Sequence, residues 1–199
     1  MQVDVRKIFG PWKDGYLLDR HIVHSEYLGE DEDGKPQFDN TRSEAGEALF
    51  QLKYRSDWSQ VEFIAQALFD DIIPNLPKID LIVPVPASTA RARQPVDEIA
   101  EALGQLAGVP VSTTLVQAKP PSADAKPLKN LTTKEEKDAA LQGRFSIDVS
   151  VPVPKDATVL VVDDLFATGA SMGAICTLLQ THPKVASVYA VAVTKTGKA

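Results

Sequence analysis

Apolar residues in this chain alternate between short continuous runs and runs with helical spacing. The run at 79–83 is nearly all apolar, and so is the run at 158–163, as expected of strands buried on both faces. Apolar residues recur every three or four positions over 59–72, which predicts a helix. The strands predicted after residue 58 are 79–83, 109–116, 145–149, 158–163 and 187–194. Further helices are predicted from about 95 to Gly108, from 132 or 133, and after 171. Such alternation predicts an α/β fold with a mainly parallel, twisted sheet flanked by helices.

The first 58 residues have a different pattern. Residues 16–28 mix β-branched and aromatic residues with polar ones, and the turn-forming stretch GEDEDGKP follows, which predicts a β-hairpin closing around Phe38. Thr41 and Glu44 have the spacing of a capping box, so a helix is expected from there to about Tyr54, and Ser59 begins a second capping box. We therefore divide the chain into an N-terminal hairpin and helix, 1–58, forming a hood or appendage, and a core, 59–199.

The composition and charge of the chain argue against several classes of protein. The 199 residues are 44% hydrophobic with a formal net charge of −6, which argues against a general nucleic-acid binder. The single cysteine, Cys176, excludes an internal disulfide and a zinc site built from cysteines, and its apolar neighbours predict a buried position. No apolar run is long enough to cross a membrane or to act as a signal peptide, so we expect a cytoplasmic protein.

The most informative stretch is VLVVDDLFATGAS, residues 159–171. Asp163 and Asp164 follow a buried strand, and adjacent carboxylates there can accept hydrogen bonds from the vicinal hydroxyls of a ribose. Residues 168–171 join this strand to a helix, where Gly169 permits close approach and the backbone amides form a phosphate cradle. A ribose 5′-phosphate therefore matches the order of these residues. A response-regulator receiver domain is the alternative, but receivers place their acids on separate strands and have no Thr-Gly loop.

This stretch resembles the phosphoribosyl-pyrophosphate (PRPP) motif of the type I phosphoribosyltransferases. Within that superfamily the chain is most similar to the ComF-like group over roughly 44–195. LIVPVPASTARARQPVDEIAEAL (81–103) resembles its strand, Pro-Val-Pro turn, basic residues and helix, while LKYR (52–55) and LQGRF (141–145) resemble two other segments. The zinc-binding cysteines of many members are absent. The usual Arg-Gly-Phe-Asn-Gln after the turn is replaced by residues 93–97, RQPVD.

The resemblance implies a function and a set of site residues. PRPP would bind with Mg²⁺ held largely by ligand and water, with no direct protein ligand, and ribose-5-phosphate would pass to or from a nitrogenous acceptor. The alternative is a PRPP- or nucleotide-sensing regulator, or a partner in DNA uptake or processing, without turnover. The implied residues are Asp163 and Asp164 for ribose; Ala167, Thr168, Gly169, Ala170 and Ser171 for the 5′-phosphate; Ala87, Ser88, Arg91 and Arg93 for pyrophosphate; and Lys119, Lys126 and Lys129 for a catalytic loop closing over the leaving group.

The sequence leaves alternatives open for the ligand, the oligomeric state and the role of the N-terminal hairpin. A nucleoside 5′-monophosphate is an alternative ligand to PRPP, a homodimer is possible, and the N-terminal hairpin could be a hood over the acceptor or a dimer contact. His21 and His24 would lie on opposite faces of a strand, which disfavours a shared metal. Lys53 could reach a phosphate, but we interpret it with Arg55 as a surface pair after a helix. Ala167 stands where hypoxanthine–guanine enzymes of this superfamily have an aspartate, so purine salvage is not expected.

Overall fold

The centre of the protein is a five-stranded sheet. The computed structural model describes residues 1–87, 91–119, 141 and 143–196. The strands lie in the order β1 (Arg6–Lys7), β2 (Gly15–Arg20), β9 (Val185–Lys195), β8 (Ala157–Phe166) and β5 (Leu81–Pro84). β2, β9, β8 and β5 run parallel, and only the short β1 is antiparallel to its neighbour. The expected α/β fold with a mainly parallel sheet is confirmed.

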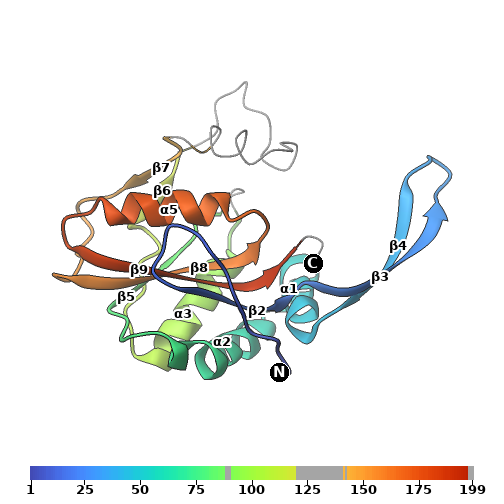
Figure 1. The fold of residues 1–199 in the computed structure, drawn as a ribbon, viewed down its shortest axis with the longest axis horizontal. Helices are drawn as coiled ribbons and strands as arrows, with labels where there is room; N and C mark the ends of the chain where they lie inside the picture. The colour runs from blue at the N-terminus through green and yellow to red at the C-terminus, as the bar shows by residue number, and fades with distance from the viewer. Residues whose placement is uncertain (88–90, 120–140, 142, 197–199) are drawn as a thin grey trace.

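Helices cover both faces of this sheet (Figure 1). α1 (Glu44–Arg55), α2 (Gln60–Asp71) and α3 (Pro95–Ala107) pack on one face, and α2 leads into a single 3₁₀ turn at Ile73–Asn75. α5 (Ala170–Gln180) packs on the other face, where Cys176 is fully buried as expected. Successive residues of β8 point to opposite faces and join different core clusters, which explains why 159–162 is uniformly apolar.

The predicted N-terminal hairpin is present, and Figure 1 shows it extending away from the body of the molecule. β3 (Ile22–Glu30) pairs antiparallel with β4 (Pro36–Arg42), and Tyr27 lies opposite Phe38 with ring centroids 5.6 Å apart. β2, which precedes the hairpin, instead lies in the central sheet beside β9. The division of the chain at residue 58 stays a prediction.

Several sequence predictions fail locally. The expected strand 109–116 is mostly absent: Val111 makes an isolated bridge to Ile82, and β6 (Val116–Ala118) begins only at its end, pairing with β7 (Phe145–Ile147). The predicted cap of α1 is also wrong, because Thr41 is paired with His24 inside β4.

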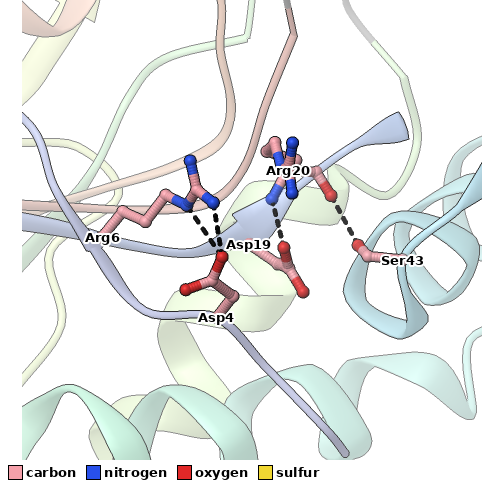
Figure 2. A network of polar contacts seen from close by, with 5 residues as sticks. All are labelled: Asp4, Arg6, Asp19, Arg20 and Ser43. Atoms are coloured by element: carbon pink, nitrogen blue, oxygen red, sulfur yellow. Dashed lines mark hydrogen bonds and ion pairs between the residues drawn. The ribbon is translucent and has the colours of Figure 1, made fainter. Parts of the chain in front are cut away.

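Ser43 caps α1 in place of Thr41. Its hydroxyl oxygen accepts a hydrogen bond from the amide of Gly46 at 3.0 Å. The same hydroxyl donates to the carbonyl of Arg20, as Figure 2 shows. Ser59, by contrast, makes no capping bond to α2. The Ser43 contact joins the start of α1 to the end of β2 and so fixes the helix against the sheet. No helix in the described part of the chain has the length and apolar character needed to cross a membrane.

Candidate functional site

The acid pair lies inside β8, at the point where the neighbouring strand β5 has ended. β8 continues to Phe166, three residues further than the sequence predicted. β5 stops at Pro84, which pairs with Val162, and the amide of Val85 makes the last link to the Val162 carbonyl at 2.8 Å. Asp163 and Asp164 are therefore paired with β9 on one side only. The other side of β8 opens at the carboxyl edge of the sheet, where parallel α/β sheets bind ligands.

The two carboxylates are held differently. Asp163 Oδ1 accepts a hydrogen bond from the amide of Asp164 at 2.8 Å. Burial, and then the charge of Asp164, raise the pKa of Asp163 above its usual range, although backbone hydrogen bonds and the ammonium of Lys53 act against this. Asp164 Oδ2 lies 2.8 Å from Lys53 Nζ. An acid pair with one cation beside it can offer several acceptor oxygens to a ligand.

Lys53 lies at the acid pair, where the sequence interpretation did not place it. Its side chain is only 21% exposed and turns inward onto the acid pair, so the interpretation as a surface pair with Arg55 is wrong. The contact joins α1 to β8 across a long stretch of sequence, and periodicity cannot predict such a contact. The only available signal was the resemblance of LKYR to a family segment.

The loop after β8 has the geometry of an anion site. Gly169 adopts φ +75° and caps α5, and no side-chain hydrogen bond from the described residues caps the helix. The first amides of α5 therefore have neither an intrahelical partner nor a side-chain partner at the cap, and they carry the positive end of the helix dipole. Ser171 is half-buried in the first turn, and Thr168 is exposed beside it. Such a helix start binds phosphate groups readily.

Two cavities meet at the acid pair. One, of about 200 Å³, lies between the turn after β5 and the acid pair; its lining includes Lys53, Ala87, Arg91, Asp163, Asp164 and Ser171. The other, also about 200 Å³, lies over the loop; its lining includes Asp163 and 165–172. Because the two cavities share Asp163 and Ser171, they adjoin, and we call them together the hollow. The predicted ribose, 5′-phosphate and pyrophosphate residues that the structure describes line it, with the exception of Arg93.

Arg93 and Lys119 lie outside this hollow. The Arg93 guanidinium donates to both carboxylate oxygens of Glu98, at 2.9 and 2.6 Å, and stacks over Trp58. Lys119 is exposed after β6, where its amide donates to the carbonyl of Arg144. Ser88, Lys126 and Lys129 lie outside the described residues.

His21 and His24 lie in different surroundings. His21 Nδ1 lies 3.1 Å from Thr194 Oγ1, and burial together with the charges of Arg42 and Lys53 lowers the pKa of His21. His24 is exposed on β3. The described ranges contain no group of three or more His, Cys, Asp or Glu residues that could hold a metal ion.

A larger cavity of about 750 Å³ lies over α5. Phe9, Pro11, Trp12 and Phe145 line it together with the small residues of the helix, and it reaches Thr168 and Gly169 at its inner end. Its walls are mainly apolar and hold none of the acids, so the chemistry of the site remains at the carboxyl edge of β8.

Comparison with known proteins gives a likeness in structure alone. No family model and no curated protein sequence matches the chain. Similar solved structures include adenine phosphoribosyltransferase from Trypanosoma brucei in complex with AMP, pyrophosphate and ribose-5-phosphate (10% identity, 98% of this chain and 87% of that one, TM-score 0.49). The enzyme from Leishmania donovani has 10% identity, coverage of 96% and 86%, and a TM-score of 0.48. Purine phosphoribosyltransferase from Pyrococcus horikoshii has 19% identity, coverage of 70% and 84%, and a TM-score of 0.44. Likenesses at this level say nothing about the ligand or reaction of this chain.

Proposed function

We propose that this chain is a phosphoribosyltransferase-like protein that binds PRPP with Mg²⁺ and transfers ribose-5-phosphate to or from a nitrogenous acceptor. The observation that supports this most is the position of Asp163 and Asp164 between two features that suit anions. On one side is the start of α5, which has no side-chain cap, and on the other is the turn at Ala87 with Arg91. A ligand with a diol between two phosphate groups matches that order.

The ribose part of the proposal rests on the acid pair. Two carboxylates offer about four acceptor lone-pair sites each, whereas a cis-diol has two hydroxyl donors. The hydrogen bond from the Asp164 amide fixes one oxygen of the Asp163 carboxylate, and both acids line the cavity beside the Ala87 turn. A ribose seated there would direct its 5′-phosphate toward the amides of α5, because the loop follows the acids directly.

The pyrophosphate part rests on Lys53 and Arg91, which line the hollow with Ala87. Mg²⁺ suits this arrangement, since carboxylate and phosphate oxygens are the ligands it prefers and it commonly keeps several waters. No direct protein ligand is expected, so the diphosphate of the ligand and water would supply the coordination positions. Bound there, the ion would neutralise charge on the diphosphate leaving group.

In the transfer, the bond between ribose C1 and the pyrophosphate oxygen breaks and a bond from the acceptor nitrogen to C1 forms. The electron pair of the broken bond stays on pyrophosphate, and the proton of the acceptor nitrogen leaves to water. Positive charge develops on the ribose ring as the leaving group departs. Arg91 and Lys53 are the described cations placed to meet the departing negative charge. A closing lysine loop stays a prediction.

Binding and turnover are tested separately. Titration calorimetry with PRPP and Mg²⁺ should detect binding, and Asp163→Asn with Asp164→Asn should weaken it by about 2–4 kcal/mol through loss of charge-assisted hydrogen bonds. Asp31→Asn with Asp33→Asn, which removes the same charge from the exposed hairpin turn, is the matched control. Equal affinity in wild type and the site variant would contradict the ribose assignment. Pyrophosphate release that requires an acceptor supports transfer, and binding without release supports the sensing alternative.

A further inference from the structure

The ion pair between Lys53 and Asp164 is sheltered from solvent. The two side chains are 21% and 15% exposed, with 2.8 Å between Nζ and Oδ2. In each of the other six ion pairs of the described residues, at least one side chain is 46% exposed or more. Exposed pairs contribute little because water screens them, whereas a sheltered pair is screened less and interacts more strongly.

The helix that carries Lys53 is fixed on the sheet. Leu49 and Leu52 of α1 are buried in the core, and Ser43 ties the start of the helix to β2. Lys53 directly follows Leu52 in the last turn, so its ammonium reaches Asp164 from a rigid support. Side chains held by packed helices position a ligand more precisely than side chains on free loops.

The acid pair needs a nearby cation. Asp163 and Asp164 are neighbours in the chain, and burial together with their mutual repulsion favours a proton on one of them. The other charged or titratable groups that face them are His21, between β2 and β3, and Arg91, before α3. Burial and nearby cations lower the pKa of His21 and so favour its neutral form. Arg42 is one of these cations, whereas Glu47 raises the pKa of His21. Arg91 Nη1 lies 3.5 Å from the carbonyl oxygen of Lys53 and not in an ion pair with either acid. Among the described residues, Lys53 is the cation that forms an ion pair with the acid pair.

We propose that Lys53 is a positioning residue that orients Asp164 and favours the ionised form of the acid pair, so that the site selects a ligand with a ribose cis-diol over its 2-deoxy analogue. This inference rests on the proposed function. Two ionised carboxylates act only as acceptors and suit two hydroxyl donors, while a protonated carboxyl loses part of that capacity. Removal of one hydroxyl leaves a buried acceptor without its partner, which gives the discrimination.

The inference is tested with two substitutions at one position. Lys53→Met keeps most of the side-chain volume and removes the charge, whereas Lys53→Arg keeps the charge. Lys7→Met is the control, since Lys7 forms an exposed ion pair with Asp14 at 3.0 Å and lines none of the cavities at the acid pair. Circular dichroism checks that each variant is folded. Calorimetry then measures the affinity for ribose-5-phosphate and for 2-deoxyribose-5-phosphate from pH 6 to pH 9.

The expected result is a loss of ligand affinity in Lys53→Met that depends on pH. Lys53→Met should weaken ribose-5-phosphate binding about tenfold or more at pH 7, one pKa unit of lost ionisation corresponding to a factor of ten, and the loss should shrink as the pH rises. Its preference for ribose over 2-deoxyribose should fall in parallel, while Lys53→Arg and Lys7→Met keep both properties. A merely structural role for Lys53 would weaken binding equally at every pH.

A second measurement needs no ligand. Carbon-13 NMR titration of the aspartate carboxyls in the empty protein should show the acid pair taking up protons at higher pH in Lys53→Met than in wild type. If wild type binds neither PRPP nor either sugar phosphate, the proposed function is wrong, and the NMR titration still decides the role of Lys53. If wild type binds ribose-5-phosphate and Lys53→Met shows the same affinity, or a loss independent of pH, the inference on Lys53 is wrong while the proposed function stands.

Discussion

Gly169 lies so close to Phe166 that a β-carbon on the glycine would be 2.6 Å from Cζ of the ring. The ring is buried and packs edge-to-face against Trp12 at a centroid distance of 6.3 Å, so it cannot move aside freely. The backbone at Gly169 also has φ +75°, which side chains rarely adopt. The loop between β8 and α5 is thereby fixed by contact with the last residue of the strand.

Gly169→Ala should therefore destabilise the protein and weaken phosphate binding. Overpacking against Phe166 together with the left-handed backbone predicts a loss of about 2–4 kcal/mol in the free energy of unfolding, measured by urea denaturation. Gly108→Ala is the matched control, because Gly108 has φ +65° with nothing within 4 Å of the added carbon. It should cost about 1 kcal/mol and leave ribose-5-phosphate affinity unchanged. A similar loss in the free energy of unfolding for both variants would show that the Phe166 ring moves aside to make room for the added carbon.

The separate positions of Arg91 and Arg93 predict different effects of substitution. Arg91→Met should weaken PRPP binding by about 1.5–3 kcal/mol, the range for hydrogen bonds to charged groups, and leave ribose-5-phosphate binding unchanged. Arg93→Met should leave both affinities unchanged, because its guanidinium is occupied by Glu98 and Trp58. Calorimetry with both ligands measures the difference. A larger loss of PRPP affinity in Arg93→Met than in Arg91→Met would reverse the assignment.

Arg91 and Arg93 also show which features of the structure could not be predicted from the sequence. Hydrophobic pattern was enough for α3 and its end at Gly108, for the buried strands β5 and β8, and for the hairpin around Phe38, because each depends on nearby residues. The approach of the Ala87 turn to Asp163 follows from parallel strands that end at the same edge. The sequence could not separate Arg91 from Arg93, since the choice depends on a stacking contact with Trp58 in another segment.

Other errors have the same origin in tertiary structure. Thr41 and Ser43 are both good capping residues, and the pairing of Thr41 in β4 leaves Ser43 to cap α1. β2 pairs with β9, from the other end of the chain, so local pattern could not place it in the central sheet. The inward turn of Lys53 depends on the packing of α1 against that sheet.

Asp163 should make the stability of the protein depend on pH. Burial and the charge of Asp164 raise the pKa of Asp163 above its unfolded value, so the folded protein binds this proton more tightly than the unfolded chain. This contribution to stability is fully present below the unfolded pKa and is lost as the pH rises toward the folded pKa. Asp163→Asn should therefore stabilise the protein relative to wild type at pH 8. The expected gain is roughly 1–3 kcal/mol, which is the cost of burying a polar group without a partner, and it should be smaller at pH 5.

Urea denaturation at both pH values measures this effect. Asp148→Asn is a control of opposite sign, because hydrogen bonds from Ser150 lower the pKa of Asp148 and its contribution is present above the unfolded pKa. That variant should lose stability at pH 8 and change little at low pH. An equal stability difference between Asp163→Asn and wild type at pH 5 and pH 8 would contradict the raised pKa of Asp163.

Hypoxanthine and guanine should not be acceptors. Ala167 follows β8 directly and precedes the Thr-Gly of the loop, where the hypoxanthine–guanine enzymes that the motif resembles carry an aspartate able to handle the proton at N7 of the purine. An alanine side chain cannot accept or donate a proton, and general acid–base help of this kind contributes typically about 10²–10⁴-fold to the rate. Steady-state assays of both bases with PRPP and Mg²⁺ should stay near background. Ala167→Asp tests the reason: a rise in either rate would identify the missing group, whereas a wild-type kcat/KM of about 10⁴ M⁻¹s⁻¹ or more for either base would contradict the prediction.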